Sequence, residues 1–263
     1  MSDLDRNYAS PFGRAAGRTD AATVDAGLRS YMLRIYNYMT IGLAITGFAA
    51  LGVYMAAVTT DQAGAVAKFG NAYLTQFGYA MYVSPLKWLF ILAPLAMVFA
   101  ISFGINRLKP ATAQLLFWAF AALMGISLSS IFLVYTHTSI VRVFFITAAT
   151  FGALSLYGYT TKRDLTGVGS FLIMGLFGII IASLVNIFLG SSMLQFIVSV
   201  VGVLIFAGLT AWDTQRLKND YIYGYASEGG EVAERAAITG ALSLYLNFIN
   251  LFTLLLQLLG QRD

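Results

Sequence analysis

The amino-acid sequence predicts an all-α, polytopic membrane protein with seven transmembrane helices. Hydrophobic residues make up 59% of the 263 residues and charged residues only 11%, whereas about a quarter of the residues in a typical soluble protein are charged. Seven continuous apolar runs are also long enough to span a bilayer, because a helix needs about 20 residues at 1.5 Å each to cross about 30 Å of hydrocarbon. Strands are excluded, since membrane barrels show alternating segments of about ten residues.

The runs give seven predicted spans. In chain order they are Tyr36–Ala57, Leu86–Ile105, Ala113–Tyr135, Ile140–Thr160, Ser170–Leu189, Phe196–Asp213 or slightly beyond, and Ile238–Leu259. The first follows a polar N-terminus, and the longest connection, Thr59–Pro85, separates it from the second. We expect this connection to be an outer loop with a partly interfacial segment. Basic residues separate the second span from the third and the fourth from the fifth, and they also follow the sixth.

Small residues are frequent within the spans. They let helix backbones approach closely where lipid supplies no hydrophobic drive for association. We interpret these positions as packing sites: Gly42, Gly47, Gly152, Gly175, Gly178, Ser183, Gly202, Ala207, Gly208 and Ala211.

The positive charges indicate the orientation. If the N-terminus is cytoplasmic, twelve Lys and Arg residues lie on that side and only Lys68, Lys87, Arg142 and Arg262 lie on the other. Cytoplasmic connections carry an excess of Lys and Arg. Seven spans then place the C-terminus in the periplasm. The net charge of +4 comes with no basic patch interleaved with aromatic residues, so we expect no nucleic-acid binding.

The N-terminal residues differ in composition from the rest of the chain. Residues Met1–Arg29 are polar and lack the apolar core of a cleavable signal peptide. We expect residues 1–29 to form a disordered cytoplasmic arm and residues 30–263 to form the transmembrane domain.

The sequence carries none of the common catalytic signatures, so we expect no enzyme activity. It has no Gly-x-Ser-x-Gly elbow, no His-Glu-x-x-His helix and no phosphate-binding loop. Cysteine is absent, and the single histidine, His137, lies in a short outer turn and cannot build a metal site alone. An intramembrane aspartyl protease needs two aspartates within spans, and only Asp213 qualifies.

Asp213 is the candidate functional residue of the sixth span. An ionisable side chain at membrane depth is costly unless it is paired or hydrated, which makes it a functional candidate. The alternative is an acid at the helix end, in water and paired with Arg216 or Arg107.

Two amides in the seventh span are candidate partners. Asn247 and Asn250 are three residues apart, so they lie on one helix face, and Asp213 is the obvious acceptor for them. Counting from the span ends, however, puts Asp213 and Asn247 at depths that differ by about 10 Å. Helix tilt, or a seventh helix that begins below the membrane, would have to close this gap.

Several segments together resemble a known family. They are Gly125–Ile131, Ser155–Leu165, the run around Asp213 and Ala241–Phe252. Their order and spacing resemble the Bax inhibitor-1 family, and more closely its bacterial YccA-like branch, from Leu28 to the C-terminus. The resemblance implies a bacterial inner (plasma) membrane protein in which six helices wrap around a central seventh.

The family's proposed activity, as the resemblance implies it, is a pH-sensitive calcium leak. A pair of aspartates on the sixth and seventh helices shares a proton, and an arginine of the second helix pairs with the first of them. Carried over, Asp213 matches this aspartate and Arg107 the arginine. The seventh-helix position is Asn247, so we expect weaker pH sensing and weaker calcium binding, with Asp213 as the calcium ligand. Ser130 stands where the family often has proline.

The resemblance leaves two functions open. The first is a passive cation leak channel with Asp213 at its cytoplasmic gate and Arg107 as its latch, without a resident cofactor and with calcium as a transient ion. The second is a non-conducting regulator of a membrane-bound ATP-dependent protease, with which the YccA-like branch is associated. The expected partners are accordingly the lipid bilayer and such a protease.

Overall fold

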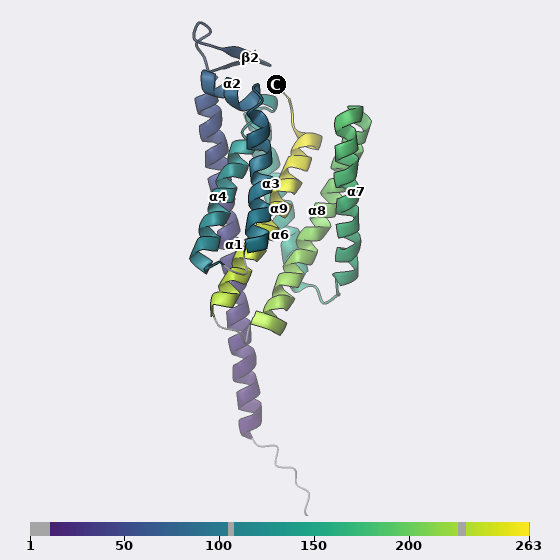
Figure 1. Ribbon diagram of the computed structural model, residues 1–263. Helices are drawn as coiled ribbons and strands as arrows, with labels where there is room; N and C mark the ends of the chain where they lie inside the picture. The colour runs from purple at the N-terminus through teal and green to yellow at the C-terminus, as the bar shows by residue number, and fades with distance from the viewer. Residues whose placement is uncertain (1–10, 105–107, 226–229, 263) are drawn as a thin grey trace, which may run out of the picture.

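The computed structural model describes the backbone of residues 11–104, 108–225 and 230–262, and the side chains of those from residue 24 onward. Within these ranges, seven helical spans are long and apolar enough to cross a membrane. In chain order the main helices are α1 (Pro11–Ala57), α3 (Lys87–Gly104), α4 (Pro110–Leu128), α6 (His137–Thr160), α7 (Thr166–Leu189), α8 (Ser192–Asp220) and α9 (Gly230–Leu259). The predicted all-α fold with seven spans is confirmed (Figure 1).

The chain runs up and down between two ends of the bundle (Figure 1). We call the end where α8 finishes and α9 begins the proximal end, and the opposite end the distal end. The long connection after α1 forms a small antiparallel sheet and a short helix at the distal end: β1 (Val58–Thr59), β3 (Ala72–Leu74) and β2 (Ala67–Phe69), in that spatial order, and α2 (Gln76–Tyr82). Leu74 of the middle strand lies opposite Val58 on one side and opposite Ala67 on the other.

The third span is interrupted near the distal end. α4 ends at Leu128, and a one-turn helix, α5 (Ile131–Val134), continues the span after Ser129 and Ser130. Tyr82 Oη donates a hydrogen bond to Ser129 Oγ over 2.9 Å. Burial raises the pKa of the Tyr82 phenol, so this donor keeps its proton and ties α2 to the interruption.

Two helices extend further than the predicted spans. α8 continues to Asp220, beyond the predicted end at Asp213, and α9 begins at Gly230 rather than at Ile238. A π-helical turn, η2 (Tyr221–Tyr225), follows α8. A hydropathy window reports only the residues within the hydrocarbon, whereas a helix continues while its backbone hydrogen bonds are made.

α1 also begins earlier than its predicted span. It starts at Pro11 and therefore includes residues 11–29, which we expected to be disordered. Alanine has the highest helix propensity, and residues 15, 16, 21, 22 and 26 are all Ala. A helix that grows from an existing span also needs no new nucleation. Residues 1–10 lie outside the described residues, and the division at residue 30 stays a prediction.

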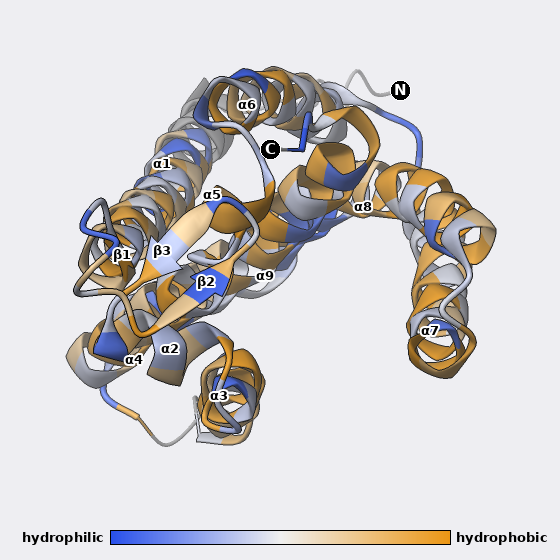
Figure 2. Cartoon of the chain, turned by 90° about the horizontal axis from the view of Figure 1, so that it is seen from above, coloured by the Kyte–Doolittle hydropathy of each residue, from blue (hydrophilic) through white to orange (hydrophobic). Residues whose placement is uncertain are grey.

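α9 is the central helix of the bundle, as predicted. It packs against α1, α4, α6 and α8, and half of its spanning window is buried within the protein. Figure 2 shows α9 near the middle, with α3 and α7 at the periphery. α3 packs on α4, and α7 packs on α8. At the core, the fully buried ring of Tyr245 meets Phe117 and Phe120 edge-on, and its hydroxyl lies 2.6 Å from Thr46 Oγ1.

Close helix packing occurs at other small residues as well as the predicted ones. A Cβ placed on Gly158 of α6 would overlap the carbonyl oxygen of Ala211 in α8, and one on Gly125 would overlap that of Thr46. By contrast, a Cβ on Gly47, Gly152 or Gly178 would meet nothing within 4 Å. These three glycines are therefore not packing positions within the described structure.

The two α6 glycines give a matched test of this packing. We expect Gly158→Ala to destabilise the protein by about 1–3 kcal/mol, as overpacking typically does. Gly152→Ala should be neutral or stabilising, because Ala is about 0.5–1 kcal/mol better than Gly within a helix. Thermal unfolding of the detergent-solubilised variants measures both. Equal melting temperatures for the two variants would contradict the close approach of α6 and α8.

Candidate functional site

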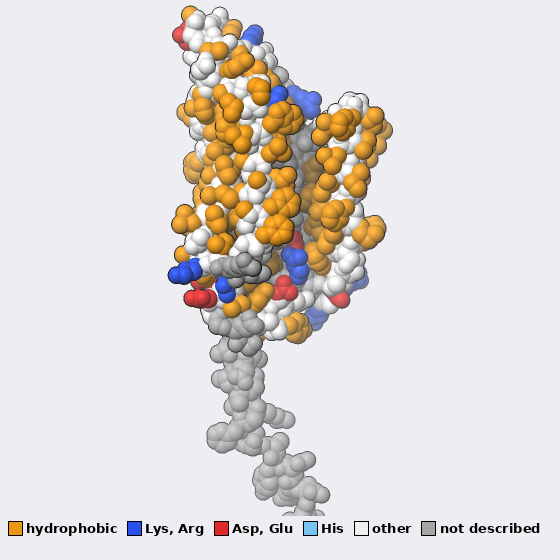
Figure 3. Space-filling model, in the orientation of Figure 1, with side chains coloured by type: hydrophobic (Ala, Val, Ile, Leu, Met, Phe, Trp, Pro, Cys, Tyr) orange, Lys and Arg blue, Asp and Glu red, His pale blue; other side chains and the backbone are white. Residues whose placement is uncertain are grey.

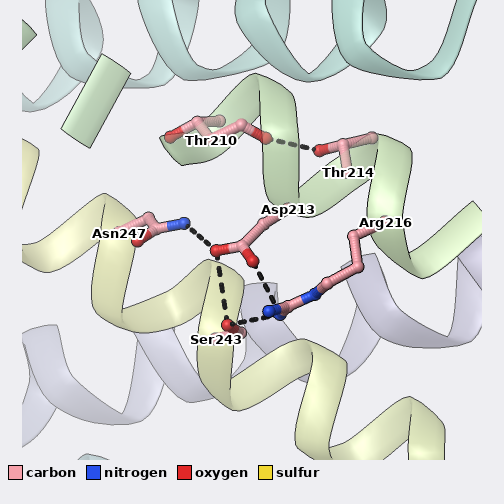
Figure 4. A network of polar contacts seen from close by, with 6 residues as sticks. All are labelled: Thr210, Asp213, Thr214, Arg216, Ser243 and Asn247. Atoms are coloured by element: carbon pink, nitrogen blue, oxygen red, sulfur yellow. Dashed lines mark hydrogen bonds and ion pairs between the residues drawn. The ribbon is translucent and has the colours of Figure 1, made fainter. Parts of the chain in front are cut away.

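Asp213 lies inside the bundle, on the face of α8 that packs against α9. Its side chain is buried, with 5% exposed. Asp213 Oδ2 accepts a hydrogen bond of 2.7 Å from Asn247 Nδ2 and one of 3.3 Å from Ser243 Oγ. Ser243 and Asn247 are one turn apart on α9 and point at the same oxygen (Figure 4). The structure therefore places this carboxylate away from bulk water and among polar partners.

An arginine of the same helix is the counter-ion. Arg216 Nη2 lies 2.6 Å from Asp213 Oδ1, one turn further along α8, and 3.4 Å from Ser243 Oγ. The guanidinium stands over the Trp212 ring, 4.7 Å from its centroid, an attractive arrangement for a cation. Of the two arginines considered from the sequence, Arg216 makes the pair, and Arg107 lies outside the described residues.

Asp213 and Asn247 meet, although counting from the predicted span ends put them at different depths. The expected depth difference of about 10 Å assumed that α8 ends near Asp213 and that α9 begins near Ile238. With α8 continuing to Asp220 and α9 beginning at Gly230, both residues lie well inside their helices. The last helix does start early, but α8 is extended by a similar length, so the early start does not by itself close the expected gap.

Asn250 plays a different part. Its Nδ2 donates to the Leu246 carbonyl of its own helix over 2.8 Å, and it makes no hydrogen bond to Asp213. It lines the same cavity as Asp213 and Asn247. The prediction of a shared face is therefore correct, whereas only Asn247 is a partner of the acid.

This cavity, which we call the groove, has a volume of about 780 Å³ and lies over α8 and α9 between α3 and α7. Figure 3 shows the hollow between the two outer helices, with acidic and basic side chains near its lower end. Its walls include Leu95 and Val98 of α3 and Ile180 and Leu184 of α7. Its floor carries a row of polar residues along one face of α9: Ser243, Asn247, Asn250, Thr253 and Gln257.

Two smaller cavities adjoin the groove. The vestibule, about 490 Å³ at the proximal end, is lined by polar and charged residues that include Tyr31, Arg216, Asp220, Arg235 and Thr239. Arg216 lines both the vestibule and the groove, whereas Asp213 lines the groove. The distal pocket, about 300 Å³, shares Ser183 and Gln257 with the groove and adds Asn186 and Gln195. Arg216 thus lies between the vestibule and the groove. Together with the distal pocket, these cavities extend along the length of α8.

A second set of polar contacts holds α8 in place. Tyr36 Oη lies 2.5 Å from Ser155 Oγ, which lies 2.9 Å from Thr214 Oγ1, so α1, α6 and α8 are joined next to Asp213. Gln215 Nε2 donates to the Arg163 carbonyl and its Oε1 accepts from the Leu165 amide, at 2.7 and 2.8 Å. These contacts fix the α6–α7 connection against the helix that carries the acid.

The other candidate residues do not form a metal centre. Among the described residues no group of three or more His, Cys, Asp or Glu is placed to hold a metal ion. His137 is exposed at the start of α6 and contacts the Tyr54 and Phe132 rings. Asp213 as a weak calcium ligand stays a prediction.

Comparison with known proteins gives a consistent picture. A family model described as inhibitor of apoptosis-promoting Bax1 matches residues 28–263. The Escherichia coli inner membrane protein YbhL is 43% identical over 239 residues, 90% of this chain and 94% of that protein. An uncharacterized Rickettsia prowazekii protein is 47% identical over 240 residues, 91% and 93% of the two chains. A Caulobacter vibrioides protein is 45% identical over 262 residues, 99% and 98%.

The buried ion pair predicts an asymmetry between its two members. Arg216→Met leaves Asp213 charged with two hydrogen bonds and no counter-ion, and we expect a loss of about 3 kcal/mol, the lower end for a broken buried pair because Arg216 is 39% exposed. Asp213→Asn should retain most of the stability, since an amide keeps the hydrogen bonds and Arg216 can turn to water.

Thermal unfolding in detergent compares these variants with the double variant. Adding Asp213→Asn to Arg216→Met should restore part of the lost stability. A double variant less stable than Arg216→Met would show that the carboxylate is tolerated without its counter-ion.

Proposed function

This chain belongs to the Bax inhibitor-1 family of multi-pass membrane proteins, and we propose that it is a passive cation leak channel, with calcium as a permeant ion, gated at Asp213. One observation carries the proposal. Three cavities follow one another along α8, and the Asp213–Arg216 pair lies where the first meets the second.

The cavities supply a route of the required length. Between Asp220 in the vestibule and Gln195 in the distal pocket, α8 rises about 37 Å at 1.5 Å per residue, against about 30 Å of hydrocarbon. Polar side chains of α9 continue along this route, and at its distal part Ser199 Oγ donates to Gln257 Oε1 over 2.8 Å. Polar groups at membrane depth mark ion pathways when they face a hydrated cavity.

Arg216 is the proposed latch in place of Arg107. Its guanidinium neutralises Asp213 and puts a positive charge between vestibule and groove, which opposes the passage of cations. When it swings towards the vestibule, where Asp220 is close enough to interact electrostatically, Asp213 is freed. Asp213 with the side-chain oxygens of Ser243 and Asn247 then offers the hard oxygen ligands that calcium prefers.

A single carboxylate at the gate fits a weak and transient site. Calcium binds tightly where several carboxylates contribute, and Asn247 contributes a neutral amide. An amide does not titrate, so Asp213 and Asn247 cannot share a proton as two acids do. The proposed leak is accordingly less sensitive to pH than one gated by an aspartate pair.

Calcium flux into dye-loaded vesicles tests the channel. We expect Arg216→Gln to raise the flux about tenfold or more, because a unit charge 4 Å from a monovalent ion is worth about 1 kcal/mol in water and about 4 kcal/mol at the lower dielectric near a protein surface. Asp213→Asn should lower it. Arg235→Gln is the matched comparison, since Arg235 lines the vestibule without touching Asp213, and it should raise the flux less than Arg216→Gln. Flux no greater than in empty vesicles for every variant would end the channel proposal.

A second candidate is the non-conducting regulator of a membrane-bound ATP-dependent protease. The observation that favours it is the length of α1, which begins at Pro11 and projects beyond the bundle at the proximal end (Figure 1). A helix outside the bilayer offers a surface on which a partner can dock without disturbing the spans.

Deleting residues 1–23 tests this second candidate. The bundle should fold, because the shortened chain keeps every buried α1 residue among those whose side chains are described, from Leu28 and Tyr31 onward. Co-purification with the protease should be lost. Full-length Arg216→Gln is the control and should still co-purify. Undiminished recovery of the protease with the shortened chain would rule out α1 as the docking element.

A further inference from the structure

A second opening lies on another side of the bundle, between α1 and α6. These helices both pack on α9 and lie side by side (Figure 2), yet two cavities lie between them, of about 560 Å³ at the proximal end and about 440 Å³ at the distal end. We call the first the proximal furrow. It is lined by residues that include Arg29, Met32, Tyr36, Phe151, Gly152 and Leu156.

The furrow exists because a glycine stands where a side chain would fill it. Gly152 lies in the wall, and a Cβ there would meet nothing within 4 Å. At its rim, Leu33 and Leu156 are 51% and 64% exposed. Such side chains at membrane depth face lipid rather than water. The furrow is therefore an apolar slot that opens sideways into the bilayer.

Its length matches one leaflet. The lining residues of α1 run from Arg29 to Thr40, a rise of about 17 Å, and half of the hydrocarbon core is about 15 Å. Met32, Met39 and Phe151 line this length, and the flexible thioether of Met adapts to irregular apolar shapes. The slot has the length and the surface for one acyl chain.

Positive charge gathers at the proximal mouth of the furrow. Arg29 lines the mouth. Lys218 Nζ donates to the carbonyl of Tyr159, also in the lining, over 2.9 Å, and Lys162 and Arg163 follow in the next connection. The acids nearby are Asp25, one turn before Arg29, and Asp164, which accepts hydrogen bonds from Thr166. Arg29 in the lining and Lys218 beside Tyr159 favour an anionic head group.

We propose that the proximal furrow binds one anionic phospholipid of the leaflet that the proximal end faces. Its acyl chain lies between α1 and α6, and its phosphate pairs with Arg29. Juxtamembrane basic residues attract anionic lipids, and here an apolar slot adjoins them. The back of the slot contains Tyr36 and Ser155, which hydrogen-bond each other. The proposal does not depend on conduction.

Photo-crosslinking locates the lipid. The protein is placed in nanodiscs with phosphatidylglycerol that carries a diazirine on one acyl chain, and labelled peptides are identified by mass spectrometry. A matched phosphatidylcholine probe has the same chain and no net charge. We expect the glycerol probe to label α1 between Arg29 and Thr40 and α6 between Phe151 and Tyr159, about tenfold more than the choline probe, which corresponds to about 1.4 kcal/mol.

Two substitutions and one control complete the test. Gly152→Phe fills the slot and should remove this labelling. Arg29→Gln leaves the slot open and should reduce the preference for the glycerol probe over the choline probe. Gly178→Phe is the control, because Gly178 of α7 also has open space beside it, and it should leave the labelling unchanged. Gly152→Leu serves as the smaller filler if the phenylalanine variant does not fold.

Three results would each overturn the site. One is equal labelling of the furrow by the two probes in the wild-type protein. Another is labelling of α7 as strong as that of α6, which would indicate general contact with the annulus of lipid. The third is undiminished labelling in folded Gly152→Phe or Gly152→Leu.

Discussion

A carboxylate withdrawn from water among packed helices must have its charge balanced where it stands, and the rest of this structure depends on that requirement. Asp213 meets it with Arg216 of its own helix and with the Ser243 and Asn247 donors of α9. Because the three partners come from two helices, they fix how α8 is rotated and how far it is shifted along α9. The same contacts place a guanidinium where the vestibule meets the groove.

The bundle separates two kinds of surface around its central helix. On the side between α3 and α7, the apolar walls enclose a polar floor, which suits water and ions. On the side between α1 and α6, the furrow is apolar along its length and basic at its mouth, which suits a lipid. Thr214 contacts the furrow side through Ser155, and its neighbour Asp213 faces the groove. One turn of α8 therefore lies between the two openings.

The fold could be predicted from the sequence because the spans are long and apolar, and a run of that length and hydropathy is enough to identify a transmembrane helix. The predicted depth difference between Asp213 and Asn247 was wrong, since counting residues from the ends of apolar runs does not report how two helices are shifted and tilted relative to each other. Ser243 was missed, although it lies four residues before Asn247 and so on the same face. No pattern in the sequence indicated the hydrogen bonds that join Tyr36, Ser155 and Thr214, because these bonds depend on how three helices far apart in sequence are rotated.

One contact gives the peripheral helix a mechanical role. A Cβ on Gly169, near the start of α7, would overlap the Trp212 indole, and the same indole carries the Arg216 guanidinium over its ring. α7 packs on α8, and none of its spanning window is buried, so its tilt can adjust to the thickness of the bilayer. The Trp212 indole thus contacts both a peripheral helix and the arginine of the buried ion pair, so a change in membrane thickness that tilts α7 would be transmitted to the Arg216 guanidinium.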